Sequence, residues 1–260
     1  MLRACPYPKI FESAPACGVR PFFECKKHDM IELFGISVSA QPIWLTLKVA
    51  LTTTVILLLV GTPLAWWLAH MRSSFKIVLE AIVALPLVLP PTVLGFYLLI
   101  AMNPNGALTQ FLHVFGFEGQ LTFSFTGLVI GSVFYSLPFA VQPLMHAFEG
   151  LPMRLLDAAA TLRAGVLDRF FSVVVPLARR GFLVAGTLTF AHTVGEFGVV
   201  LMVGGNVPDT TRMVSIAIFD HVESLEYAEA HLLSGMMLVF SVVVLMLVYG
   251  INRRFAVKVG

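Results

Sequence analysis

Long apolar windows are the feature that most restricts how this chain can fold. Five of them can cross a hydrocarbon core of about 30 Å, which needs about 20 helical residues; they lie near residues 43–69, 77–102, 123–148, 182–203 and 232–251. Hydrocarbon offers the backbone no hydrogen-bond partner, so each window is predicted to be a helix. With 58% hydrophobic and 12% charged residues, the chain has more apolar surface than a soluble domain can bury. The predicted fold class is therefore all-α, a polytopic membrane protein with five transmembrane helices.

The basic residues that flank these windows predict the orientation of the chain. Ten of them follow the first, third and fifth windows: Arg72, Lys76, Arg154, Arg163, Arg169, Arg179, Arg180, Arg253, Arg254 and Lys258. On the opposite side, segments 103–122 and 204–231 contain only Arg212. Because cytoplasmic loops are enriched in Lys and Arg, we expect the N-terminus outside and the C-terminus inside. The net charge of +2 gives no reason to expect a nucleic-acid partner.

Residues 1–29 differ in composition from the rest of the chain. They hold four prolines, five of the 17 Lys and Arg residues and all three cysteines, Cys5, Cys17 and Cys25, without an apolar run. A signal peptide would need such a run. We expect residues 1–29 to be a disordered or non-native extension before a start at Met30, and residues 30–260 to form a single transmembrane domain. The apolar body has no cysteine, so neither a disulfide framework nor a metal site is predicted there.

A polar, basic segment at about 150–178 separates the third and fourth windows. Pro152 suits the first turn of a helix, and three consecutive alanines, 158–160, favour helix strongly. A second amphipathic stretch at 166–175 is expected to end at Pro176. One interpretation is an interfacial helix that rests on lipid headgroups; the other is a helix–turn–helix that contacts a soluble partner.

The order of residues in this segment resembles the coupling motif of binding-protein-dependent ABC importer permeases. That motif is Glu-Ala-Ala, three residues, Gly, and then Pro at a fixed distance, and Asp157, Ala158, Ala159 and Pro176 fall on matching positions. The resemblance implies that the segment, with Leu162, docks on a separate ATPase subunit. Two residues depart from the motif: Asp157 replaces Glu, and Arg163 replaces Gly. Because a non-Gly residue resists positive φ, we expect the turn to move to Gly165.

The chain offers no means of hydrolysing ATP itself. It contains no Gly-Lys pair and therefore no Gly-Lys-Ser/Thr phosphate loop. We expect no enzyme activity, no catalytic residue and no cofactor on this chain, with ATP-Mg bound by the partner ATPase subunit.

Three prolines interrupt the second window. Pro86, Pro90 and Pro91 are followed by Thr92 and Gly95, and each proline leaves a backbone carbonyl without its helical partner. In a membrane such groups are tolerated where they face protein or a water-filled cavity. The segment is either a simple kink or, as we prefer, a distorted helix that lines a pathway.

Glu196 is the only acid well inside any window. Intramembrane acids usually face the interior of a helix bundle, and Glu196 lies at the same predicted depth as Pro90. We expect it to accept hydrogen bonds near the broken helix, with Thr92 as a candidate donor. His192 stands one turn earlier, but two ligands make only a weak metal site. Gly195 and Gly198 are expected to allow close helix packing.

Three motifs together resemble the permease subunits of molybdate ABC importers, with sulfate permeases as close relatives. They are Leu-Pro-Leu-Val-Leu-Pro-Pro at 85–91 followed by Gly95, Phe-Ala-x-x-x-Gly-Glu-Phe-Gly at 190–198, and Asn-Val-Pro-x-Thr-Thr-Arg at 206–212. The resemblance covers about residues 40–252. It implies a multi-pass protein of the cell inner membrane that forms a homodimer, with two ATPase subunits and an external molybdate-binding protein. Sulfate and tungstate remain alternative cargoes.

The resemblance also places residues 204–231 near the outer mouth of the pathway. Arg212 could attract an oxyanion there, or it could serve as an interfacial anchor. Two other classes of protein stay open: an intramembrane enzyme and a membrane scaffold without transport. The enzyme is disfavoured because the chain has no Gly-x-Ser-x-Gly motif and no second buried carboxylate beside Glu196. The broken second window argues against a scaffold.

Overall fold

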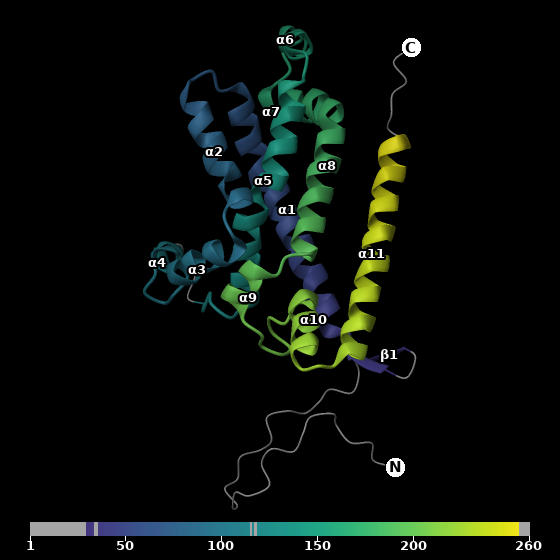
Figure 1. The fold of residues 1–260 in the computed structure, drawn as a ribbon. Helices are drawn as coiled ribbons and strands as arrows, with labels where there is room; N and C mark the ends of the chain where they lie inside the picture. Colours follow the sequence, from purple (N-terminus) through teal and green to yellow (C-terminus); the bar gives the residue numbers. More distant parts are fainter. Residues whose placement is uncertain (1–29, 34–35, 115, 117–118, 255–260) are drawn as a thin grey trace, which may run out of the picture.

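The protein is a helical bundle with one small β-hairpin (Figure 1). The computed structural model describes residues 30–33, 36–114, 116 and 119–254. Its elements are β1 Met30–Leu33, β2 Ile36–Ser39, α1 Gln41–His70, α2 Phe75–Val88, α3 Pro91–Ala101, α4 Ala107–Val114, α5 Phe125–Glu149, α6 Met153–Thr161, α7 Val166–Arg169, the π-helix η1 Phe170–Val174, α8 Val175–Val194, α9 Gly198–Gly204, α10 Val214–Glu223 and α11 Tyr227–Arg254.

Four helical segments among the described residues are long and apolar enough to cross a membrane: Gln41–His70, Phe125–Glu149, Val166–Val194 and Tyr227–Val248. The pair Phe75–Val88 and Pro91–Met102 passes the same test jointly but is bent by 108°. The helices predicted at 43–69, 123–148 and 232–251 are confirmed.

Two of the predicted windows are wrong in detail. The window at 77–102 is interrupted at its prolines, as predicted, but it forms two separate helices, α2 and α3, bent by 108°, rather than one distorted helix. The window at 182–203 begins too late and ends too late. The helix there starts at Val166 and stops at Val194, and the remaining residues form the separate helix α9.

Helices α1, α5 and α8 form the core of the bundle. In Figure 1, α1 and α5 run in the same direction and α8 runs between the same two ends in the opposite direction. Small residues let these helices approach closely. A Cβ placed on Gly61 of α1 would lie 3.7 Å from the Cβ of Ala140 on α5, and one on Gly181 of α8 would collide with Ala147. The three helices therefore have fixed registers against one another.

Helix α11 packs much less tightly than the core. Only 6% of its apolar window is buried inside the chain. Its first turns contact the hairpin and α10 through the buried residues Val38, Ala217 and Leu233. The remaining apolar surface needs a cover outside this chain, either lipid or another protein.

Two ends of the molecule are distinct in Figure 1. Helix α6 and the last turns of α11 lie at one end, whereas the hairpin and α10 lie at the other. The segments predicted to be cytoplasmic thus share one end. The hypothesis about residues 1–29, the three cysteines and Lys258 concern parts of the chain outside the described residues.

Candidate functional site

The break between α2 and α3 follows directly from the sequence Leu89-Pro90-Pro91. A residue before proline is driven out of the α region, and here two residues in succession precede one. Leu89 has ψ 135° and Pro90 has ψ 134°, both extended, and α3 then begins at Pro91, where a missing N–H has no cost. The break therefore needs no support from the rest of the fold.

The break between α8 and α9 contains no proline. Helix α8 ends at Val194, Gly195 keeps φ −86° and ψ 0°, and Phe197 leaves the helical region with φ −129°. The freed carbonyl of Glu196 accepts a hydrogen bond of 2.6 Å from the hydroxyl of Ser215 on α10. A contact between distant segments thus holds this second break.

The two breaks lie directly against each other. A Cβ on Gly198 would come within 2.7 Å of the Cβ of Pro91, and one on Gly95 would come within 2.8 Å of the Cβ of Met202. The predicted packing role of Gly198 is confirmed. For Gly195 the packing prediction is wrong, because the nearest atoms to its added Cβ are carbonyl oxygens of its own helix, at 3.7 and 3.9 Å.

A cavity of about 560 Å³ opens where the breaks meet. It collects several of the predicted pathway residues on one surface, and its lining comprises Pro91, Thr92, Tyr135, Ala191, His192, Gly195, Glu196, Phe197, Gly198, Leu201 and Met202. Pro86, Pro90 and Gly95 are not part of this lining: Pro86 lies inside α2, Pro90 precedes α3, and Gly95 faces α9.

Glu196 is only 3% exposed, and neither carboxylate oxygen has a hydrogen-bond partner of ordinary geometry among the described residues. The predicted hydrogen bond from Thr92 is therefore wrong. The side-chain hydroxyl that faces the carboxyl is that of Ser132 on α5. The reason is the break itself, which ends α8 at Val194 and leaves Glu196 in a turn beside α5.

His192 belongs to a separate polar cluster one turn away. Its Nδ1 is hydrogen-bonded to the Ser136 hydroxyl at 3.0 Å, which also contacts the Thr193 hydroxyl at 2.9 Å, and its ring stacks on Phe139 at 3.9 Å. Within the described residues, no group of three or more His, Cys, Asp and Glu side chains is placed to hold a metal ion. His192 thus joins α8 to α5.

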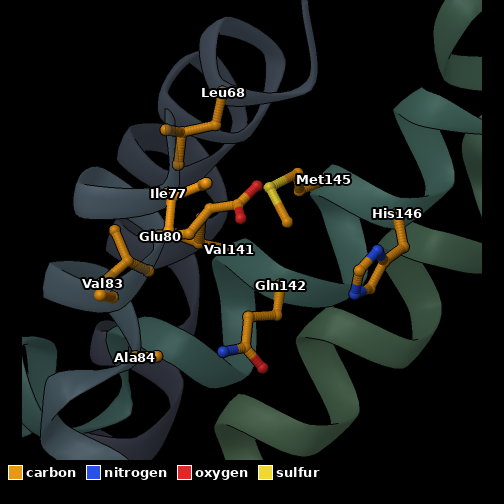
Figure 2. A pocket seen from close by; sticks show the side chains of 10 residues that line it. Leu68, Ile77, Glu80, Val83, Ala84, Val141, Gln142, Met145 and His146 are labelled. Atoms are coloured by element: carbon orange, nitrogen blue, oxygen red, sulfur yellow. The ribbon is translucent and has the colours of Figure 1, made fainter. Parts of the chain in front are cut away.

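A second cavity, of about 430 Å³, lies between α1, α2 and α5 (Figure 2). Glu80 of α2 and Gln142 and His146 of α5 lie around it with apolar neighbours. Beside it, the Lys76 ammonium contacts Glu149 of α5 at 2.7 Å and Glu80 at 3.6 Å. This ion pair joins the ends of α2 and α5. Sequence reasoning missed it, because Lys76 and Glu149 are far apart in the chain.

The polar segment forms α6 and the turn that follows it. Asp157, Ala158 and Ala159 lie on α6, and the turn is a Schellman motif, in which Arg163 N–H donates to Ala160 O at 3.0 Å and Ala164 N–H donates to Ala159 O at 3.1 Å. This motif needs one residue with positive φ, and that residue is Arg163, with φ 61°.

The expected shift of the turn to Gly165 is therefore wrong. Gly165 has φ −65° and begins α7 in an ordinary extended conformation. The helix geometry fixes the position of the turn, so Arg163 adopts the conformation that the resembling motif gives to glycine. Leu162 beside it is 83% exposed.

Pro176 was predicted to end the second helix of this segment, and that prediction is also wrong. Helical structure continues from Val166 to Val194. It passes through the π turn η1, whose last hydrogen bond joins Val175 N–H to Phe170 O, and Pro176 then lies in the first turn of α8. The wider π turn ends where proline removes a donor. Phe170 also packs edge-on against Trp66 of α1, with ring centroids 6.2 Å apart.

On the other end of the molecule, Arg212 is held in a closed set of polar contacts. Its Nη2 lies 3.1 Å from Asp220 and its Nε donates to Asn206 at 2.6 Å, while Asn206 donates to Asp220 at 2.9 Å. The charge of Arg212 is thus compensated by Asp220 in this conformation. An outer-mouth role for Arg212 stays a prediction.

Comparison with known proteins places these features in a family. A sequence model described as "Binding-protein-dependent transport system inner membrane component" matches residues 61–257, which include both breaks, both cavities and the polar segment. The chain belongs to this family. Binding-protein-dependent transport components are parts of transport systems rather than enzymes.

Individual members of the family are similar over most of the chain. The molybdenum transport system permease protein ModB of Azotobacter vinelandii is 62% identical over 211 residues, which are 81% of this chain and 92% of that protein. ModB of Escherichia coli (strain K12) is 34% identical over 71% of this chain and 80% of its own. The sulfate transport system permease protein CysT of Salmonella typhimurium is 30% identical over 76% of this chain and 71% of its own.

Solved structures agree at the level of fold. The crystal structure of a bacterial ABC transporter involved in the import of alginate contains a chain with a TM-score of 0.64, at 15% identity, over 83% of this chain and 80% of that one. A second crystal structure shows a bacterial alginate ABC transporter in complex with a pentasaccharide-bound periplasmic protein, at the same TM-score. Identity this low supports a shared fold alone.

Proposed function

We propose that this chain is the pathway-forming permease subunit of an ABC importer for molybdate. The observation that carries the proposal is the 62% identity to a molybdenum transport permease over 92% of that protein's length. Sulfate permeases match at 30% identity, so sulfate is the weaker alternative, and tungstate is a third dianion of similar size and charge.

The proposed assembly contains two copies of this chain, two ATPase subunits that bind ATP-Mg, and an external molybdate-binding protein. The exposed apolar face of α11 supports contact with lipid or a second copy. The exposed polar segment around Asp157, Leu162 and Arg163 supports docking of the ATPase, because it presents one charged and one apolar anchor at a rigid turn. We place this end in the cytoplasm of a multi-pass inner-membrane protein, with the N-terminus outside.

Five spans then cross the membrane, and the bent pair α2 and α3 forms one of them. A broken helix at membrane depth is tolerated where it lines a cavity, and here it lines the cavity beside Glu196. We infer that this cavity belongs to the transport pathway, with Pro91, Thr92, Gly195, Glu196 and Gly198 on its surface.

The geometry suggests how ATP binding reaches the cavity. Helical structure runs without interruption from the polar segment at Val166 to the break at Val194. A displacement of α6 and α7 would therefore be transmitted along α8 to Gly195 and Glu196. The two breaks pack on each other, so motion of one changes the other and reshapes the pathway between them.

Competition uptake tests the cargo. Vesicles that contain this permease with its cognate ATPase and binding protein are expected to take up labelled molybdate in the presence of ATP. A hundredfold excess of sulfate should leave that uptake largely intact, whereas unlabelled molybdate should abolish it. Equal inhibition by sulfate would make the chain a sulfate permease.

Co-purification tests the coupling surface. Leu162→Asp places a charge at the exposed apolar anchor and is expected to remove the ATPase from the purified complex. Glu223→Arg at the far end of the molecule is the matched charge-changing control, and it should retain the ATPase. Retention of the ATPase by Leu162→Asp and by a further Asp157→Arg variant would contradict docking at this segment.

A further inference from the structure

The Glu196 carboxyl is buried, and the proposed function does not account for it. Its residue is 3% exposed, and both oxygens lack a hydrogen-bond donor of ordinary geometry among the described residues. Glu196 also takes part in none of the ion pairs that join the described side chains. An ionised carboxylate without compensation is very unfavourable in such surroundings.

The hydroxyl that faces this carboxyl and can donate to it is that of Ser132 on α5. Ser132 on α5 is fully buried, and its hydroxyl has no partner of ordinary geometry among the described residues either. The register of the antiparallel helices brings the two together. Ser136 is bonded to His192. Ser132 lies one turn before Ser136 on α5, and Glu196 lies four residues after His192, just past the end of α8.

The surroundings supply oxygen atoms and no fixed positive charge. Thr92 and Tyr135 line the same cavity of about 560 Å³ as Glu196, whose two carboxylate oxygens are themselves buried. Tyr135 and His192 are the titratable neighbours that line it, and the Nδ1 of His192 is engaged by Ser136. Helices α3 and α9, which pack against the break, carry no Asp, Glu, His, Lys or Arg. Helix α10, whose Ser215 binds the Glu196 carbonyl near the start of that helix, carries Asp220, His221 and Glu223 at its other end.

We propose that Glu196 and Ser132 form an internal binding site for one small monovalent cation, a proton or Na⁺, taken up from this cavity. Carboxylate and hydroxyl oxygens are the ligands that hard cations prefer. A single acid neutralises one positive charge, and the described residues contain no group of three or more His, Cys, Asp and Glu side chains placed to hold a divalent metal. The bound cation compensates the buried carboxylate.

The consequence for transport rests on the proposed function. If the cavity carries a dianion, an ionised Glu196 repels the cargo, and a neutralised one does not. Cation occupancy would then be required for the anion to pass the break. The site itself can be tested without any cargo, so its failure and a failure of the molybdate proposal are distinguishable.

Infrared spectroscopy of the purified full-length permease in nanodiscs tests the proton. If the cation is a proton, the carbonyl stretch of a protonated carboxylic acid should be present at neutral pH and should be missing in Glu196→Gln. Glu223→Gln makes the same chemical change on the exposed end of α10 and should leave the band in place.

Binding of ²²Na⁺ to the same preparation tests sodium. If the cation is Na⁺, binding should saturate at one ion for each chain, should be lost in Glu196→Gln, and should weaken by at least about tenfold in Ser132→Ala.

The proposal would be overturned if the permease showed neither a Glu196-dependent acid band at neutral pH nor saturable, Glu196-dependent Na⁺ binding. Glutamine keeps the size of glutamate, so the variant is expected to fold, and its thermal unfolding in the same nanodiscs verifies this. If Glu196→Gln fails to fold, Ser132→Ala decides. An unchanged pH dependence of the acid band together with unchanged Na⁺ affinity in Ser132→Ala would then contradict the site.

Discussion

The two helix breaks that meet at the cavity are made in different ways. Between α2 and α3, two consecutive residues precede proline and are extended for that local reason. Between α8 and α9 there is no proline, and a hydroxyl from α10 binds the carbonyl of Glu196. One break is a property of its own segment, whereas the other depends on a contact with α10.

This difference suggests which break can move. The α2–α3 bend should persist in any conformation, because the restriction before proline does not depend on its neighbours. The α8–α9 break can change when Ser215 moves away from Glu196. It also lies at the end of the continuous helix that starts beside the polar segment. The cavity where the breaks meet is therefore expected to have one fixed wall and one adjustable wall.

Replacement of both Pro90 and Pro91 gives the largest expected change in the bend between α2 and α3. Pro90→Ala and Pro91→Ala singly should keep the bend, since each leaves one proline that restricts its predecessor. The double variant should straighten α2 and α3 into one helix. It removes the prolines, each of which makes a continuous helix less favourable than alanine would by about 3 kcal/mol. Spin labels at Val78 and Ile100, on opposite arms of the 108° bend, would report this as a longer distance by pulsed electron resonance. A bend retained by the double variant would show that packing holds this break too.

The contact between the breaks should respond to glycine substitution at one position and not at the other. Gly198→Ala places a Cβ 2.7 Å from the rigid ring of Pro91. Such overpacking costs about 1–3 kcal/mol and should lower the thermal unfolding temperature in detergent. Gly195→Ala is the matched control, because its Cβ has room and its φ is −86°. Similar destabilisation by both variants would argue against close packing at Gly198.

The break between α8 and α9 is expected to loosen when the Ser215 hydroxyl is removed. Ser215→Ala leaves the Glu196 carbonyl without its donor, which costs about 1–3 kcal/mol for a buried group. Hydrogen exchange of residues 195–198 should become faster, while exchange in α2 and α3 should stay unchanged. Ser241→Ala removes a hydroxyl that donates to Met237 O of its own helix, and it serves as the control. Unchanged exchange in Ser215→Ala would mean that packing alone holds the break.

The turn after α6 extends the comparison to a third irregular segment and gives the smallest effect. Arg163 has φ 61°, a conformation that costs a non-glycine residue about 1 kcal/mol. Arg163→Gly should therefore stabilise the turn slightly and slow its proteolysis. Gly165→Ala, at φ −65° and with open space around its Cβ, should be tolerated. Faster proteolysis of Arg163→Gly would indicate that the arginine side chain itself supports the turn.

Much of the fold could be predicted from the sequence, because apolar length alone identifies a spanning helix. The bend after α2 could be foreseen as a distortion, since proline acts on its own neighbours. The end of α8 at Val194 could not, because it depends on Ser215, which is remote in the chain. Glu196 could be singled out as an acid inside an apolar window, and the structure buries it. Its neighbour Ser132 follows only from the register of α5 against α8.

Errors in the polar segment have a similar origin. Arg163 was expected to avoid positive φ on the basis of residue preference, yet the Schellman hydrogen bonds place the turn there. Pro176 was expected to stop a helix, and a π turn accommodates it instead. In both cases the geometry of the whole helix outweighed the preference of a single residue.

The register of α1 against α5 offers a route to cross-linking. All three cysteines of the chain lie at positions 5, 17 and 25, so residues 30–260 form a thiol-free background for labelling. A Cβ on Gly61 would stand 3.7 Å from that of Ala140, close to the mean of about 3.8 Å found in disulfides. The pair Gly61→Cys and Ala140→Cys should therefore oxidise without backbone movement, and a reducing agent would then remove this covalent link and leave α1 held to α5 by packing alone.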